Sequence, residues 1–205
     1  MKWTNSLDEV MGSRLKVRLV RILCDSDEPK TGMRLAKAAG YSHTQTYKAL
    51  DELEELGLVT SWASGAAYLY SVNRESYLVR EVLTPALRAE REIIRALAQR
   101  FYDRLGEDLL SVVVYGSVAR KEDQAGSDID LILVCRDGSD VEDLEFAAAE
   151  VSLSASREFA GSVSAFVFEE KTYQKRLRQG KAMWSDVRKE GVPVARRSEK
   201  VASLG

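Results

Sequence analysis

Apolar residues in the first 60 positions recur at the three- and four-residue spacing of amphipathic helices. The earliest group predicts a first helix and consists of Leu15, Leu19, Ile22 and Leu23. A second helix is expected over residues 33–39, with Thr31 as its N-cap and Gly40 at its end. The pattern therefore predicts that the chain begins as a helical domain.

Ser42 and Gln45 have the S-x-x-Q spacing of a capping box, which predicts the start of a third helix. We expect Gly57 to end this helix, whose apolar side consists of Tyr47, Leu50, Leu53 and Leu56. Two short runs, residues 58–62 and 68–72, then predict two strands joined by small residues at 63–66. Three helices are thus followed by a β-hairpin.

Residues 74–106 continue the helical spacing and form a predicted connector. Asn73 can cap this segment, and Pro85 marks a break or a fresh helix start. The apolar stripe of the connector consists of Leu83, Leu87, Ile94, Leu97, Phe101 and Leu105. Such a stripe fits a helix packed on its own domain and a dimer seam equally well.

Strands and helices alternate after residue 107. A valine-rich run at 112–115 predicts a strand, and a second apolar run at 131–134 predicts another. Ser139 and Glu142 have capping-box spacing and predict a helix that runs to about residue 159. Two further elements are expected, a strand at 161–168 and a helix at 171–181.

Composition narrows the class of protein. The 205 residues are 45% hydrophobic and 30% charged, which fits one or two folded domains and argues against a disordered chain. No apolar run approaches the roughly 20 residues of a membrane span, and the first residues lack the layout of a secretion signal. We therefore expect a cytoplasmic protein that does not contact a membrane.

Histidine and cysteine are too scarce for several kinds of site. Cys24 and Cys135 lie in apolar runs, and we interpret both as small buried hydrophobic residues. One histidine and two distant cysteines practically exclude a zinc site of Cys/His type. A Ser/His/Asp hydrolase would need His43, which lies on the third predicted helix, so we do not expect that chemistry.

Charge is unevenly distributed around the second and third predicted helices. The net charge of −2 argues against general coating of nucleic acid, so a DNA contact must come from a local patch. Residues 30–50 contain no acid and four cations, Lys30, Arg34, Lys37 and Lys48. A helix amino terminus without acids favours phosphate through its dipole and free N–H groups.

This order of elements resembles the winged helix-turn-helix family over about residues 12–73, most clearly in LAKAAGYSHTQTYKALDELEELGLV. The resemblance implies that the third helix enters the major groove of double-stranded DNA and that the hairpin contacts the backbone. The groove-facing positions would be Ser42, His43, Thr44, Gln45 and Lys48. The alternative is a domain used only for protein contact or dimerisation.

The strand at 112–115 leads into a turn that suits an anion. Gly116 lets the backbone approach a ligand closely, and Ser117 adds a hydroxyl beside free N–H groups. Asp128 and Asp130 are two positions apart on the next strand, so both carboxylates emerge on one face. Adjacent carboxylates repel each other, which favours a cation such as Mg²⁺ or a raised pKa. The alternative is a surface turn whose acids are merely solvated.

The segment GSVARKEDQAGSDIDLILV resembles the signature of the polymerase-β-type nucleotidyltransferases, close to their minimal members, and the resemblance covers about residues 107–180. It implies a nucleoside triphosphate as substrate or ligand, Mg²⁺ (two ions if the enzyme is active), and attack of an acceptor hydroxyl on the α-phosphorus. Asp128 and Asp130 would be the catalytic metal ligands. The nucleotide would be held by Gly116, Ser117, Arg120, Lys121 and Ser127.

One part of the family pattern is missing, a third carboxylate on a later strand. Ser164 occupies the expected position, and a small slip in the alignment gives Ala165, one residue later, or Ser162, two residues earlier. Glu169 and Glu170 could substitute only if the strand ended early. Because a hydroxyl is a poor Mg²⁺ ligand, the sequence supports nucleotide binding better than turnover.

Aromatic residues near the C-terminus have two interpretations. Phe166 and Phe168 either line a base pocket or belong to the core. Trp184 and Val187 are expected to pack on the domain.

The sequence as a whole predicts an α+β chain with four segments. These are a winged helix-turn-helix domain (1–73), a helical connector (74–106), a nucleotidyltransferase-like domain with a small mixed sheet backed by helices (107–190), and a polar tail (191–205). A homodimer is expected, because winged-helix proteins that bind DNA usually need two half-sites.

Three functions stay open on this evidence. The first is a nucleotidyltransferase tethered to a DNA-binding module, with a protein side chain or a small molecule as acceptor. The second is a transcriptional regulator whose transferase-like domain only senses a nucleotide. The third is a protein that docks a toxin-like helix-bundle partner.

Overall fold

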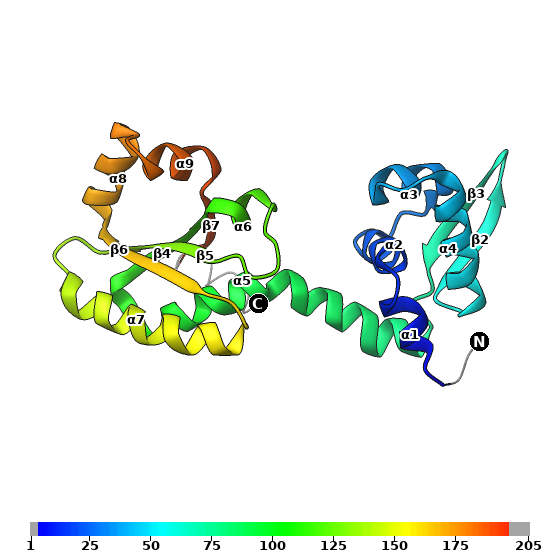
Figure 1. Cartoon of the computed structure of the whole chain (residues 1–205), viewed down its shortest axis with the longest axis horizontal. Coiled ribbons are helices and arrows are strands. Elements are labelled where there is room, and N and C mark those ends of the chain that lie inside the picture. The colour runs from blue at the N-terminus through cyan, green and yellow to red at the C-terminus, as the bar shows by residue number, and fades with distance from the viewer. Residues whose placement is uncertain (1–3, 197–205) are drawn as a thin grey trace, which may run out of the picture. The chain divides into compact units, whose positions relative to one another are not determined.

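A computed structural model describes residues 4–196 of the protein. The chain divides into two compact units, Met1–Arg91 and Glu92–Gly205 (Figure 1). Each unit has a hydrophobic core of its own. Residues 197–205 of the expected tail lie outside the described residues. Within residues 4–196, no helix is both long and apolar enough to cross a membrane.

The first unit is a three-stranded sheet covered by helices. Its helices are α1 (Ser6–Met11), α2 (Arg14–Cys24), α3 (Gly32–Ala39) and α4 (His43–Glu55). Its strands are β1 (Lys30–Thr31), β2 (Val59–Ser64) and β3 (Ala67–Val72), in the antiparallel order β1-β3-β2. The arrangement is a winged helix-turn-helix fold, as predicted, with α1 and β1 added to the expected elements.

Side-chain caps determine where α3 and α4 begin. The Thr31 hydroxyl accepts a hydrogen bond from the backbone N–H of Arg34 at 3.3 Å. In the capping box of α4, the Ser42 hydroxyl accepts from the Gln45 N–H at 3.3 Å, and the Gln45 side-chain oxygen accepts from the Ser42 N–H at 3.4 Å. Gly40 ends α3 at a φ of 73°, a left-handed conformation that favours glycine. These predictions are confirmed.

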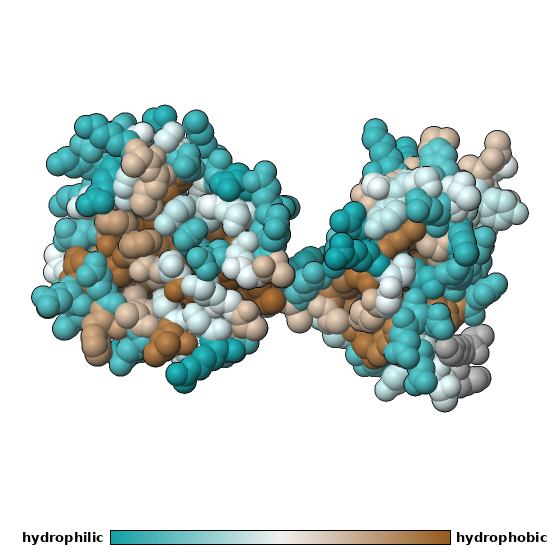
Figure 2. Space-filling view, in the orientation of Figure 1, coloured by the Kyte–Doolittle hydropathy of each residue, from teal (hydrophilic) through white to brown (hydrophobic). Residues whose placement is uncertain are grey.

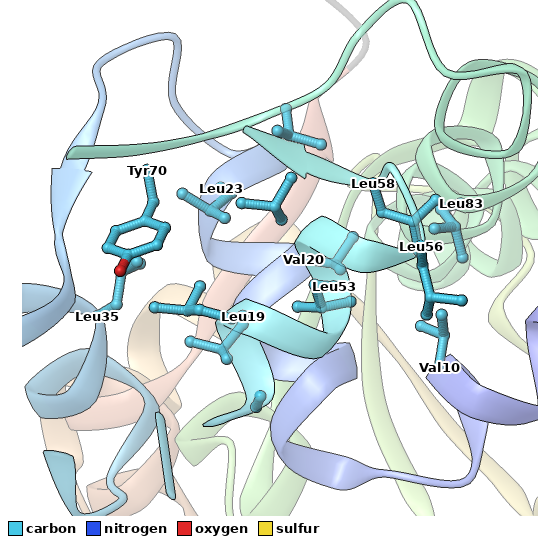
Figure 3. Packing of buried hydrophobic residues seen from close by; sticks show 14 of the residues in the cluster. Val10, Leu19, Val20, Leu23, Leu35, Leu53, Leu56, Leu58, Tyr70 and Leu83 are labelled. Carbon is cyan, nitrogen blue, oxygen red and sulfur yellow. The ribbon is translucent and has the colours of Figure 1, made fainter. Parts of the chain in front are cut away.

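The core of the first unit joins all three main helices to the hairpin. Figure 3 shows Leu19 of α2, Leu35 of α3, Leu53 of α4 and Tyr70 of β3 in one cluster. All three leucines are fully buried, and each such side chain stabilises the fold by about 1.5–3 kcal/mol.

The buried side of α4 differs by one residue from the prediction. Tyr47, expected on the apolar side, is 41% exposed, and Thr46 is fully buried in its place. Thr46, Ala49, Leu50 and Leu53 follow the helical repeat, which leaves Tyr47 at the edge of that stripe. The Tyr47 ring instead covers Gly32, where an added Cβ would lie 2.6 Å from it.

The connector is a π-helical turn, η1 (Val79–Leu83), followed by α5 (Thr84–Leu105). Pro85 is the second residue of α5, but the helix is continuous from residue 77, so Pro85 lies where π-helical geometry changes to α-helical geometry and not at a fresh helix start. Asn73 does not cap the connector, because its side chain accepts from the N–H of Glu75 and donates to the carbonyl of Gly57. The expected cap is therefore wrong.

The apolar stripe of the connector packs within both units. Leu83 and Leu87 join the first core, whereas Leu97, Phe101 and Leu105 join the second. These contacts support packing on the chain's own domains, and the dimer seam stays a prediction.

The second unit is a four-stranded mixed sheet. Its strands are β4 (Leu109–Tyr115), β5 (Ile129–Cys135), β6 (Val163–Glu169) and β7 (Val192–Arg196), in the order β6-β5-β4-β7. The pair β5 and β6 is parallel, and the other two pairs are antiparallel. The remaining elements are η2 (Gly106–Asp108), α6 (Gly116–Arg120), α7 (Val141–Glu158), α8 (Glu170–Gln179) and α9 (Met183–Glu190).

Helices cover both faces of this sheet. The second half of α5 and α7 pack on one face, through a core that includes Phe101 and Leu131. On the other face, Trp184 and Val187 of α9 pack in one core with Ile132, as expected for these two residues. The α+β class with a small mixed sheet backed by helices is confirmed.

Two boundaries differ from the prediction. Asp140, not Ser139, is the N-cap of α7, and its carboxylate accepts from the N–H of Asp143 at 3.2 Å. The Ser139 hydroxyl instead donates to Asp108 at 2.9 Å. Residues 192–196, expected in a polar tail, form β7 at the edge of the sheet beside β4.

Candidate functional site

Three residues of adjacent strands form a row across the sheet of the second unit. Asp130 at the start of β5 pairs with Tyr115 at the end of β4 and with Ser164 on β6. Paired residues of neighbouring strands point to the same face. This is the face that α8 and α9 cover, because Tyr115 shares a core with Trp184. The structure thus places the predicted Ser164 beside the predicted Asp130.

Gly116 follows Tyr115 directly and lies close to the Asp130 carboxylate. Its φ is +76°, and a Cβ added to it would lie 2.8 Å from Oδ2 of Asp130. Both facts require glycine here, since an L side chain would be strained and would meet the carboxylate. The first residue of the G-S motif therefore makes room for the second carboxylate of the D-x-D motif.

The pKa of Asp130 reflects its burial and the charge of the neighbouring Asp128. Burial, followed by the nearby charge of Asp128, raises the pKa of Asp130. Burial and then the Asp130 charge raise the pKa of Tyr115. Negative charge is therefore costly at this point of the sheet, and a bound cation would lower that cost.

The donor set fits one divalent cation. Asp128 is exposed and Asp130 partly buried, so a metal bound there could keep water and phosphate ligands as Mg²⁺ does. Within residues 4–196, no group of three or more His, Cys, Asp or Glu side chains is arranged to hold a metal. The two predicted carboxylates are brought together, but the third ligand that a second ion needs is not among them.

The substitution of Glu169 or Glu170 for the missing carboxylate is wrong. Glu169 is the last residue of β6, five positions beyond Ser164, which is about 16 Å along a strand. Its carboxylate accepts from the N–H of Gly138 at 2.8 Å. Glu170 begins α8 still further away.

The predicted nucleotide ligands around α6 have other partners as well. The Arg120 guanidinium pairs with Glu122 and with Glu190 of α9, both at 2.7 Å, which raises its pKa. Ser127 closes its loop, because its hydroxyl accepts from the Gln124 N–H at 2.9 Å. Ser117 lies partly buried in α6, and Lys121 is exposed. The two predicted cations thus differ, since Arg120 is neutralised by acids.

The two phenylalanines of β6 have different surroundings. Phe168 packs edge-on against Trp184, with ring centroids 5.1 Å apart, and Arg176 lies over its ring at 4.7 Å. Phe166 is 48% exposed and pairs with Ile132, two positions along from Ser164. Phe168 is therefore core, whereas Phe166 is an exposed ring on the site's face.

In the first unit, the five predicted DNA-facing residues of α4 are all exposed. Ser42 and Gln45 also cap their own helix, which occupies the Gln45 side-chain oxygen and leaves its NH₂ group as a donor. His43, Thr44 and Lys48 keep exposed side chains on the same first turns. The segment can therefore present donors and one cation to a groove.

The hairpin of the first unit differs from a charged wing. Residues 59–72 contain no lysine or arginine. Its exposed large side chains are Trp62, 42% exposed, and Tyr68, 58% exposed. A backbone contact by this hairpin would depend on main-chain donors, hydroxyls and aromatic rings.

Sequence reasoning missed two residues that shape the site. The sequence predicts Tyr115 only as the end of a strand, and it predicts no role for Glu190 beyond its place at the domain boundary. Their roles follow from strand register and from the packing of α9 on α6, which no local spacing encodes.

Residues 90–181 match the family model described as nucleotidyltransferase domain. No curated protein sequence matches the chain.

The comparison with solved structures found matches that each cover about half of this chain. A homodimeric winged helix-turn-helix DNA-binding domain from Mycobacterium bovis is 16% identical over 47% of this chain and 95% of that chain, with a TM-score of 0.36. A chain in a crystal structure of a toxin-antitoxin with AMP-PNP is 15% identical over 53% of this chain and 75% of that chain, with a TM-score of 0.36. A candidate nucleotidyltransferase from Sulfolobus solfataricus is 21% identical over 55% and 81%, with a TM-score of 0.34.

Gly116 of the G-S motif lies against Asp130 of the D-x-D motif, and the family model covers both motifs. The candidate site therefore lies within the segment that matches the family model of the nucleotidyltransferase domain.

Proposed function

We propose that the second unit binds a nucleoside triphosphate with Mg²⁺ and transfers its nucleotidyl group, while the first unit binds double-stranded DNA. The observation that carries the proposal is the position of Asp130. This residue lies close to Gly116 and pairs with Tyr115 on one side and Ser164 on the other. The closeness of Gly116 and Asp130 supports a role for the Gly116 turn in binding phosphate and for the Asp130 carboxylate in binding the metal ion.

In the proposed reaction, Asp128 and Asp130 would hold the ion, and Gly116 and Ser117 would offer backbone N–H groups and a hydroxyl to the phosphates. When bound, Mg²⁺ supplies Lewis-acid stabilisation of the charge that develops on the triphosphate. The acceptor hydroxyl oxygen forms a bond to the α-phosphorus, and the bond from that phosphorus to the bridging oxygen breaks. Pyrophosphate leaves, and the hydroxyl proton passes to solvent.

Ser164 limits the expected rate. A third carboxylate at this position would hold a second ion near the attacking hydroxyl, and a serine hydroxyl is a poor substitute. We therefore expect slow transfer that depends on one ion.

Label transfer from [α-³²P]ATP tests the proposal, with Mg²⁺ and cell lysate as the source of acceptors. Asp130→Asn should abolish transfer and weaken binding of a non-hydrolysable ATP analogue. Asp123→Asn is the matched control, because this acid lies exposed in the same loop and outside the row. Equal transfer by the wild type and Asp130→Asn would contradict the proposal.

A second candidate is a nucleotide sensor without transferase activity, and the serine at position 164 favours it. It predicts that the wild type binds the ATP analogue with Mg²⁺ but labels no acceptor. Transfer of label by the wild type, lost in Asp130→Asn, would exclude the sensor.

DNA binding by the first unit is tested by selection from a random duplex pool. Arg34, Lys37 and Lys48 are exposed, and none has an acidic partner among the residues that the structure describes. Lys48→Ala should weaken binding and reduce the salt slope by about one, whereas Arg88→Ala on α5 should not. A pool from which no sequence is enriched would contradict this part of the proposal.

A further inference from the structure

Charge is strongly segregated within the second unit. Residues 92–170 contain seven Lys/Arg and seventeen Asp/Glu, whereas residues 171–189 contain seven Lys/Arg and one Asp. The cationic segment lies within α8 and α9, whose full span with their connection, residues 170–190, contains seven cations and three acids, Glu170, Asp186 and Glu190. We call this segment the α8–α9 surface.

Most cations of the α8–α9 surface have no acid to neutralise them. Six are exposed and lack an acidic partner among residues 4–196: Lys175, Arg176, Arg178, Lys181, Arg188 and Lys189. Elsewhere in this unit, Arg100 pairs with Glu158 and Arg104 with Glu150. The α8–α9 surface is thus the place where a polyanion meets uncompensated positive charge.

The chemistry of the surface favours a phosphate backbone over an acidic protein. No large hydrophobic side chain is exposed within residues 170–190, although protein interfaces usually have an apolar centre. Figure 2 shows mainly hydrophilic residues over α8 and α9. Binding of phosphates requires only cations and the release of their counterions.

An exposed aromatic ring lies on the same face of the sheet. Phe166 is 48% exposed and stands two positions along β6 from Ser164. Surfaces that bind single strands combine cations for the backbone with aromatic rings on which bases stack. Bases are free to stack on such a ring only in a single strand.

The surface is connected to the candidate site. Glu190 at the end of α9 pairs at 2.7 Å with Arg120 of α6, the helix that begins with Gly116 and Ser117. Tyr173 and Leu177 of α8 pack into the core that contains Tyr115. Both helices therefore cover the face on which Asp130 and Ser164 lie.

We propose that the α8–α9 surface and Phe166 bind a single-stranded nucleic acid, and that a terminal hydroxyl of this strand is the acceptor. The acceptor role rests on the proposed transferase activity, whereas binding does not. In the step, the terminal hydroxyl oxygen bonds to the α-phosphorus of the nucleoside triphosphate, pyrophosphate leaves, and the proton passes to solvent. The strand grows by one nucleotide.

Binding is tested with the full chain and fluorescent 20-nucleotide RNA and DNA single strands, without nucleoside triphosphate. The variant Lys175→Ala/Arg178→Ala/Lys189→Ala should bind at least tenfold more weakly, with a salt slope reduced by about two. The control Arg95→Ala/Arg100→Ala/Arg157→Ala removes the same charge from α5 and α7 and should bind as the wild type does. Phe166→Ala should weaken binding without changing the salt slope.

Three results would overturn the binding proposal. The first is an equal loss of single-strand binding in the two triple variants. The second is that the protein binds neither RNA nor DNA single strands. The third is that the protein binds polyglutamate more tightly than either strand, which would indicate an acidic protein as partner. Lys48→Ala should leave single-strand binding unchanged, which separates this surface from α4.

Label transfer to the unlabelled strands tests the acceptor role. Label on the strand, lost in the α8–α9 triple variant, supports it. Label on protein only would overturn the acceptor role and leave the transferase proposal standing. An absence of label on any acceptor would overturn the transferase proposal and with it the acceptor role, while the binding result is measured independently.

Discussion

At the residue scale, the site depends on what stands beside Asp130. Ser164 is its neighbour in the parallel pair, on the same face of the sheet. Ser164→Asp should create a third carboxylate and raise the rate of nucleotidyl transfer by about tenfold or more. The measurement is initial rates of label transfer against Mg²⁺ concentration, with Ser162→Asp as the control at the exposed position before β6. No gain in rate or metal affinity would mean that the hydroxyl position is not where a second ion binds.

The raised pKa of Asp130 makes a pH-dependent prediction. A carboxyl whose folded pKa is raised contributes stability that is full below its unfolded pKa and is lost as pH rises through the folded pKa. Asp130→Asn should therefore be more stable than the wild type at pH 7 without divalent cations, and the difference should shrink as pH falls towards 4. Chemical denaturation across this pH range measures it. Added Mg²⁺ should stabilise the wild type only.

Thr46 provides a test of polar burial. It is fully buried, and its hydroxyl has no hydrogen-bond partner. Thr46→Val replaces the hydroxyl with a methyl group of similar size, and should raise the free energy of unfolding by about 1 kcal/mol. Urea denaturation checks this, with Thr46→Ser as the control that keeps the hydroxyl and loses the methyl group. A loss of stability in Thr46→Val would reveal a hidden partner.

At the element scale, the start of α7 separates local pattern from structure. Ser139 and Glu142 have capping-box spacing, yet Asp140 caps the helix. Asp140→Ala should cost about 1 kcal/mol of stability, because an N-cap side chain and a favourable charge near the helix dipole are both lost. Ser139→Ala should cost less, since it removes only an exposed bond to Asp108. The reverse order of the two losses would restore the capping-box prediction.

The sequence predicts those helices and strands whose signals lie within a short stretch of the chain, and it misses those that depend on distant partners. The helices α3 and α4 and the hairpin follow from spacing and turn residues within about 40 positions. The π-turn before Thr84 and strand β1 have no such signal, because β1 exists through its pairing with β3. Strand β7 was missed for the same reason, since its partner β4 is far away in the chain.

At the scale of the whole molecule, the two units have separate cores. Leu53 belongs to the first core and Phe101 to the second, and both are fully buried. Leu53→Ala should cost about 2–5 kcal/mol and raise hydrogen exchange within residues 1–91. Phe101→Ala, the matched change, should cost about 3–5 kcal/mol and raise exchange within residues 92–196. Hydrogen exchange measured by mass spectrometry distinguishes two separate cores from one cooperative core. In a single cooperative core, either variant would raise exchange in both units.

The sequence alone determined the features that depend on spacing within one segment. The S-x-x-Q cap of α4 and the hairpin are of this kind, and so is the distance from Gly116-Ser117 to Asp128 and Asp130. Such spacings act through backbone geometry that holds before any long-range contact forms. Only the tertiary structure decided the register that places Asp130 between Tyr115 and Ser164, the pairing of Arg120 with Glu190, and the position of the cationic helices on the face of the acids. These depend on strand pairing and packing between distant residues, which the local pattern does not specify.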